Sequence, residues 1–155
     1  MTDTLSSFQT EAEKQVEDEF LATGYMIGDV ENRDTLDKIR ALIVDTCSAH
    51  LGDPAPPAPQ DYLDNIATKV EVDHLNALRL NILSGIRNAP WFRAAYYSLA
   101  RDMLTNLVGN ELSMQKNINL SIQMPGDESS LLPVHADVLN GDSPFEVVLW
   151  VPLVD

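Results

Sequence analysis

The chain has 155 residues, 45% of them hydrophobic, and a formal net charge of −14. That length suffices for one domain with a hydrophobic core. The acidic balance argues against general binding to nucleic acids or anionic membranes, because phosphate groups attract basic surfaces. No apolar run approaches the roughly 18 residues that a membrane span needs, and the acidic N-terminus is unlike a signal peptide. A single cysteine, Cys47, excludes an internal disulfide and favours the reducing cytoplasm.

The residues before the proline-rich stretch predict two helices. Ser6 or Ser7 can cap the first helix, and Gly24 is placed to end it. Its apolar residues are spaced four apart: Phe8, Ala12, Val16 and Phe20. The second helix stops near Gly52 and carries an apolar stripe made of Leu36, Ile39, Ile43 and Cys47. Its place on this stripe predicts that Cys47 is a core thiol rather than a nucleophile.

Residues 53–59 contain four prolines and predict an extended connector on the surface. Three further helices are predicted after it, the last beginning near Pro90 and ending at Gly109. Their apolar stripes are Leu63, Ile66 and Val70; then Leu75, Leu78, Ile82 and Ile86; then Trp91, Ala95, Leu99, Met103 and Leu107.

The pattern changes to period two near Gln115. Apolar residues at 118, 120, 122 and 124 alternate with Asn117, Asn119, Ser121 and Gln123. This alternation predicts a strand with one apolar and one polar face. A Pro-Gly-Asp turn at residues 125–127 and a short run at residues 131–138 follow, and residues 145–154 alternate again as a last strand.

Helices followed by strands predict an α+β fold with the helices on one side of an antiparallel sheet. We expect a single domain, residues 1–155, with a helical part at residues 1–110 and strands at residues 115–155. Three or four strands cannot close a barrel, and they leave the edges of the sheet exposed. The sheet is therefore expected to be incomplete, with the remaining strands supplied by a homo-oligomer or by a missing C-terminal half.

The motif that could carry chemistry is His135-Ala136-Asp137. On a strand, residues two apart point to the same face, with about 7 Å between their Cα atoms. Such an imidazole and carboxylate can hold one cation, and non-haem iron(II) oxygenases bind their metal with two histidines and one carboxylate. On the motif alone, a surface histidine followed by a turn-forming aspartate is slightly favoured.

The polar row on the first predicted strand could complete such a site. Inside a small barrel, the amides of Asn117, Asn119 and Gln123 could hydrogen-bond a dicarboxylate. A solvated outer face is the alternative for the same residues.

Three segments carry a resemblance to a known family: NLSIQMPGD at residues 119–127, LPVHAD at residues 132–137 and FEVVLWVPLVD at residues 145–155. They resemble the first core strands of phytanoyl-CoA dioxygenase-like oxygenases, and most of all the bacterial branch from sporadic carbohydrate-biosynthesis clusters. FLATGYMI at residues 20–27 resembles the opening of that family. The resemblance implies a double-stranded β-helix, or jelly roll, backed by N-terminal helices, with His135 and Asp137 as two iron ligands.

The resemblance also implies a function. The family uses iron(II) and 2-oxoglutarate to hydroxylate or otherwise oxidise small molecules, here a carbohydrate-related metabolite. It needs a second histidine and an arginine on later strands, and this sequence ends before either position. His50 and His74 are expected on helix surfaces, so the 155-residue chain is expected to be weakly active or inactive. The alternatives are a non-catalytic acidic interaction module and a cupin-like metal enzyme that does not use 2-oxoglutarate.

Overall fold

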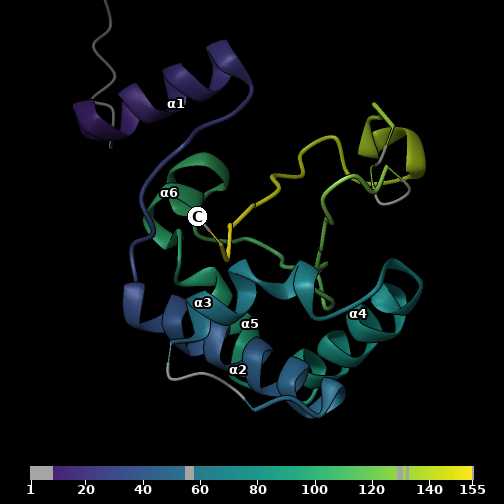
Figure 1. The fold of residues 1–155 in the computed structure, drawn as a ribbon. Helices are drawn as coiled ribbons and strands as arrows, with labels where there is room; N and C mark the ends of the chain where they lie inside the picture. The colour runs from purple at the N-terminus through teal and green to yellow at the C-terminus, as the bar shows by residue number, and fades with distance from the viewer. Residues whose placement is uncertain (1–8, 55–57, 129–130, 132, 155) are drawn as a thin grey trace, which may run out of the picture.

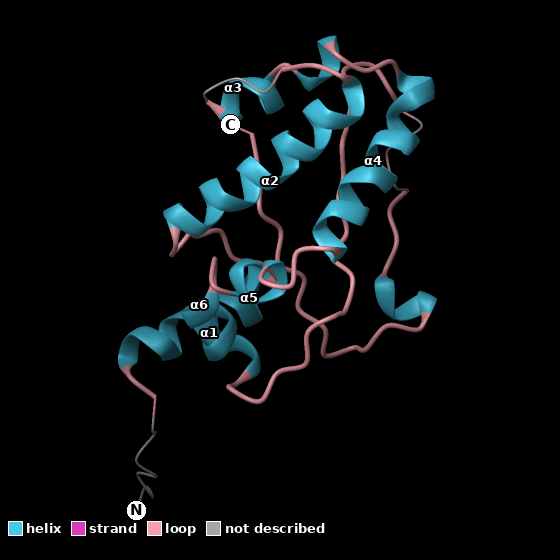
Figure 2. Ribbon diagram, turned by 90° about the horizontal axis from the view of Figure 1, so that it is seen from below, coloured by secondary structure: helices cyan, strands magenta, loops and turns pink. Residues whose placement is uncertain are grey.

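The computed structural model describes residues 9–54, 58–128, 131 and 133–154. The elements in chain order are α1 (Glu11–Thr23), α2 (Arg33–Leu51), α3 (Pro59–Asp64), η1 (Ile66–Thr68), α4 (Val72–Arg87), α5 (Phe92–Tyr97), α6 (Arg101–Val108) and η2 (Asp137–Asn140), where η marks a 3₁₀ helix. No β-strand occurs within these ranges (Figure 2). The expected α+β fold with a partial jelly roll is therefore wrong, and the described residues form an all-helical arrangement with long loops.

The core is built on α2, whose ends follow from its sequence. The Asn32 side chain accepts a hydrogen bond from the Thr35 N–H at the start of α2. Gly52 ends α2 in the left-handed conformation, with φ 64°. The predicted stripe faces inward: Leu36, Ile39, Ile43 and Cys47 are all buried.

Helix α4 packs along α2 and closes the core (Figure 2). Its predicted stripe is also confirmed, since Leu75, Leu78, Ile82 and Ile86 are buried. Gly85 allows the close approach of the two helices, because a Cβ atom there would lie 2.8 Å from Thr46 Oγ1 of α2. Burying each such leucine or isoleucine contributes about 1.5–3 kcal/mol, so this helix pair is the main source of stability.

Helix α1 lies apart from this core and contacts α6 (Figure 1). It begins at Glu11, with a capping box between Thr10 and Glu13, and ends at Gly24 as predicted. The expected caps Ser6 and Ser7 and the first stripe residue, Phe8, lie outside the described residues. None of the residues in α1 is buried, so α1 adds little to the core.

Two predicted helices are each broken into shorter pieces. The stripe at 63–70 is divided between α3, η1 and a loop, although Leu63 and Val70 are buried as expected. The stripe at 91–107 is interrupted between α5 and α6. At this break Leu99 is buried, and its carbonyl oxygen accepts a hydrogen bond from the Glu31 N–H. Helical spacing predicted burial correctly for Leu63, Val70 and Leu99, while the other five stripe residues are only partly buried, and it did not locate the turns between them.

The two stretches of alternating residues run as extended loops over the helices. At 117–124 the apolar residues are partly or fully buried and the polar ones exposed. Residues 147–154 also alternate between partly buried and exposed, but both sets are apolar. Among the described residues, no backbone hydrogen bond joins either stretch to another element. Helix side chains donate to their carbonyls instead: Tyr96 Oη to Leu149 O at 2.7 Å, Arg40 Nε to Leu153 O at 3.0 Å, and Arg79 to Ile122 O. The apolar faces were predicted correctly except at Phe145, which is 87% exposed, and the predicted pairing into a sheet was wrong.

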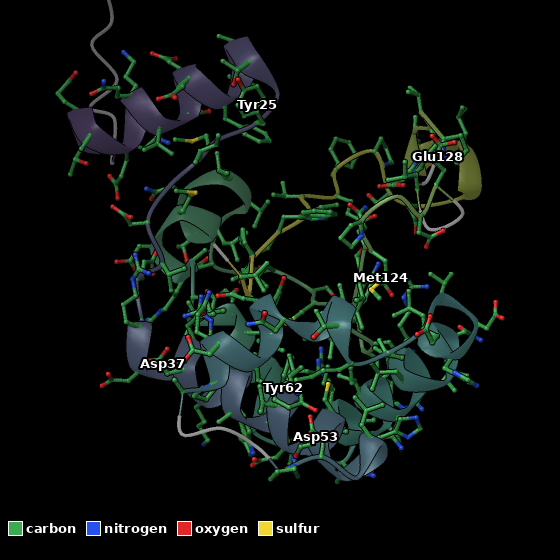
Figure 3. All side chains as sticks on the ribbon, in the orientation of Figure 1. Tyr25, Asp37, Asp53, Tyr62, Met124 and Glu128 are labelled. Carbon is green, nitrogen blue, oxygen red and sulfur yellow. The ribbon has the colours of Figure 1, made fainter. Side chains whose placement is uncertain are left out.

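Between these stretches, the chain leaves the helical layer and returns to it. Figure 3 shows Met124 against the helices and Glu128 out in the projecting loop. The same loop carries η2 (Figure 1). In the described part of the chain, no helix is long and apolar enough to cross a membrane.

Candidate metal site

The projecting loop brings together the two predicted metal ligands. His135 Nε2 lies 3.1 Å from Asp137 Oδ1. Ala136 between them is extended, with φ −126° and ψ 124°, and Asp137 opens η2. An extended central residue places its two neighbours on the same side, so the predicted convergence occurs in a loop, without the strand that was expected to produce it.

A carbonyl of the loop fixes the orientation of the imidazole. His135 Nδ1 lies 2.7 Å from the Pro133 carbonyl oxygen. Because a carbonyl can only accept, Nδ1 must carry the proton of this hydrogen bond. A carbonyl partner on the far nitrogen is also what metal-binding histidines use to fix their tautomer.

The contact between Nε2 and the carboxylate then has two chemical forms. If Nε2 is also protonated, the imidazolium and Asp137 form an ion pair. If Nε2 is unprotonated, its lone pair faces the carboxylate oxygen, and a cation between them relieves the repulsion. An imidazole nitrogen and a carboxylate oxygen are both types of ligand that iron(II) accepts.

The described residues supply only these two ligands. No group of three His, Cys, Asp or Glu side chains able to hold a metal occurs among them. His50 and His74 are exposed on α2 and α4, as expected. The side chains of His135 and Asp137 are 41% and 50% exposed, so water reaches the pair and would fill the other coordination positions.

The predicted co-substrate residues lie on the first extended stretch rather than inside a barrel. Asn117, Asn119 and Gln123 are exposed. In the described part of the chain, no hydrogen bond connects them to His135 or Asp137. Their solvated position matches the alternative that the sequence left open, and their role in binding a dicarboxylate stays a prediction.

The chain matches no known family model, no curated protein and no solved structure. The resemblance to phytanoyl-CoA dioxygenase-like oxygenases therefore rests on the sequence segments alone.

A shallow pocket of about 330 Å³, which the sequence did not predict, lies beside α3. Lys69 Nζ forms an ion pair with Asp53 Oδ2 at 2.5 Å near this pocket and lies 4.7 Å from the centre of the Tyr62 ring. Burial, and then the neighbouring Asp53 carboxylate, raise the pKa of Tyr62 to about 12. Tyr62 therefore stays a neutral phenol, and the pocket resembles a structural ion-pair cluster more than a catalytic site.

Proposed function

We propose that this chain contributes two ligands, His135 and Asp137, to the iron(II) site of a 2-oxoglutarate-dependent oxygenase in the cytoplasm. The substrate class follows from the sequence resemblance and is a small, carbohydrate-related metabolite. The observation that carries the proposal is the convergence of His135 Nε2 and Asp137 Oδ1 at 3.1 Å, with Nδ1 held by the Pro133 carbonyl.

Each residue has a separate task in this proposal. Pro133 holds the imidazole with Nε2 toward the metal position, and Asp137 supplies negative charge to the cation. Asn117, Asn119 and Gln123 would be the residues that hydrogen-bond the carboxylates of 2-oxoglutarate. The bound metal and 2-oxoglutarate supply the oxidising chemistry, as cofactors do in such enzymes. Two exposed ligands bind iron(II) weakly, so a third ligand must come from outside the described residues, and turnover by these residues alone is expected to be very low.

Metal titration tests the proposal directly. Cobalt(II), a spectroscopic substitute for iron(II), should bind the chain weakly, and His135→Ala or Asp137→Ala should weaken binding by roughly tenfold or more, which corresponds to about 1.4 kcal/mol. Binding should also weaken as the pH falls, because a proton competes with the metal for Nε2. His74→Ala, which removes an exposed helical histidine, is the matched control.

Equal cobalt(II) affinity in the wild-type chain and in both site variants would contradict the proposed ligands. Adding 2-oxoglutarate to the iron(II) form without oxygen separates the oxygenase from a cupin-like enzyme. Only bidentate chelation of iron(II) by 2-oxoglutarate gives a visible charge-transfer band.

A second candidate function is a non-catalytic acidic interaction module. It is favoured by the exposed apolar side chains of the C-terminal stretch, where Phe145, Val148 and Trp150 are 87%, 57% and 75% exposed. Isolated exposed apolar residues are ordinary, but several on one short segment are typical of an interaction surface. Retained cobalt(II) binding in the site variants would support this function over the oxygenase.

A further inference from the structure

We infer that the C-terminal extended stretch, residues 147–151, accepts a basic peptide in extended conformation as an added β-strand. The inference rests on the second proposed function, the interaction module, and gives it a partner of defined chemistry. It does not depend on metal at His135 and Asp137.

The backbone of this stretch offers one free edge. In an extended chain, the N–H and C=O of one residue point to one side and those of its neighbours to the other. The hydrogen bonds from Tyr96 to Leu149 and from Arg40 to Leu153 occupy the side of the odd-numbered residues. Among the described residues, the backbone groups of Val148 and Trp150 have no hydrogen-bond partner. Unpaired edges of this kind are the sites at which peptides bind by strand addition.

The exposed side chains of this stretch are apolar, and they do not cover the free backbone edge. Val147, Leu149 and Val151 are partly buried, Val151 against the helical core, whereas Val148 and Trp150 are exposed. The stretch is thus held on one face and on one edge, while its other face and other edge reach solvent. An exposed tryptophan beside a valine provides the kind of aromatic anchor that dominates many peptide interfaces.

Pro152 limits how far the pairing can extend. It falls on the same side as Val148 and Trp150 and has no N–H to donate. At the other end, the Glu146 N–H already donates to the Ser143 carbonyl at 3.1 Å. On the side that faces away from Tyr96 and Arg40, the free donors are those of Val148 and Trp150, and we expect a short pairing of moderate affinity.

Charge identifies the partner as basic. No Lys or Arg follows Lys116 in the sequence, whereas five of the described residues beyond it are acidic: Asp127, Glu128, Asp137, Asp142 and Glu146. Glu146 is only two positions from the free edge. A second copy of this chain, with its net charge of −14, would be repelled from this surface. A strand in which basic and apolar residues alternate complements both the charge and the exposed apolar row.

The test uses the 155-residue chain and three labelled peptides, with EDTA present to remove metal. In one peptide lysine alternates with valine, in the second glutamate replaces lysine, and in the third prolines replace alternate valines of the lysine peptide. Fluorescence anisotropy should show binding of the first peptide only, and binding should weaken with added salt. Infrared spectra of the complex should show a new β-strand amide I band.

Variants at the edge locate the binding site. Val148→Pro removes one donor and should weaken binding by about fivefold. Trp150→Ala removes the anchor and should weaken it by about tenfold. Leu80→Ala, at an exposed apolar residue of α4, is the matched control and should bind as the wild type does. Because the side chains of all three residues are exposed, an unchanged helical circular dichroism signal should show that each variant folds.

Each contrary result has a defined meaning. Equal binding of the proline peptide would overturn strand addition, and equal binding of the glutamate peptide would overturn the basic partner while leaving an interaction surface. No binding of any peptide, or self-association of the chain that Val148→Pro abolishes, would overturn the inference altogether. His135→Ala should bind the lysine peptide normally, so failure of the iron proposal leaves this result unaffected.

Discussion

Cys47 shows how burial controls the chemistry of a single side chain. It is 1% exposed on the inner face of α2, and this burial raises the pKa of the thiol to about 11 from its ordinary value of 9.0. The thiolate, which is the reactive form, is therefore scarce in the folded protein. A core thiol was the interpretation from the sequence, and its burial confirms it.

The raised pKa of Cys47 predicts a loss of stability at high pH. Above pH 9 the unfolded chain loses the thiol proton while the folded chain keeps it, so the free energy of unfolding should fall between pH 9 and about 11, by at most about 3 kcal/mol. Urea unfolding of the wild type and of Cys47→Ala at pH 8 and at pH 11 measures this. Tyr62 also contributes a loss above pH 10, and Cys47 is one of the groups that raise its pKa, so the difference between the two proteins measures Cys47 together with its coupling to Tyr62.

An equal fall in unfolding free energy for the wild type and for Cys47→Ala would contradict the shifted thiol. Labelling by a thiol reagent gives a second check at neutral pH. Cys47 should react only as fast as the core opens, and much faster in denaturant.

At the scale of elements, α6 depends on a cap that is distant in sequence. Both carboxylate oxygens of Glu31 accept a hydrogen bond from the Asp102 N–H, at 3.0 and 3.1 Å, and one also accepts from the Met103 N–H at 3.3 Å. These amides belong to the first turn of α6, which lacks a cap from its own preceding residue. A carboxylate satisfies such free donors and is favoured by the helix dipole.

Removing this cap should destabilise the protein. Glu31→Ala is expected to lower the free energy of unfolding by about 1 kcal/mol, measured by urea denaturation. Glu71→Ala is the matched control, because Glu71 stands at the N-cap position of α4 but makes no side-chain capping bond. Equal losses in the two variants would show that the Glu31 contacts contribute nothing specific.

The distant cap also explains which element boundaries the sequence could predict. Gly24, Gly52 and Gly109 end their helices where expected, because a helix C-terminus depends on local backbone conformation. The break between α5 and α6 depends on Glu31, which lies far along the chain. The spacing of apolar residues at 91–107 does not indicate that contact, so one continuous helix was expected.

The same distinction between local and distant contacts accounts for the wrong fold class. Alternation at 117–124 and 147–154 correctly predicted which side chains are shielded from solvent. Period two specifies an extended backbone, but a sheet also needs a second strand in register. In this chain the Tyr96 hydroxyl donates a hydrogen bond to the Leu149 carbonyl. A helix side chain thus takes the role that a neighbouring strand would have in a sheet.

The candidate site was predictable in part for the same reason. His135 and Asp137 are two positions apart, and their contact needs only an extended Ala136 between them. The hydrogen bond to Pro133 is equally local, although no motif pointed to it. The expected enclosure by a barrel required distant strands, and in the structure the two side chains are about half exposed.

For the whole molecule, the packing of α2 against α4 should set the stability. Ile82 is 1% exposed in this interface, so Ile82→Ala should lower the free energy of unfolding by about 2–5 kcal/mol. Leu80→Ala, on the solvent side of the same helix at 56% exposure, should change it by less than about 0.5 kcal/mol. Thermal or urea unfolding followed by circular dichroism measures both, and a small loss for Ile82→Ala would place the core elsewhere.

The hydrogen bond between Arg40 and Leu153 spans 113 positions of the chain. All the helices of the packed layer are complete by Val108. During synthesis, α2 to α6 can therefore assemble while the final stretch is still in the ribosome, and that stretch then docks onto a surface that already exists. A nascent chain arrested near residue 145 should already resist protease digestion in its helical part, and residues 117–154 should become protected only once they have emerged and docked.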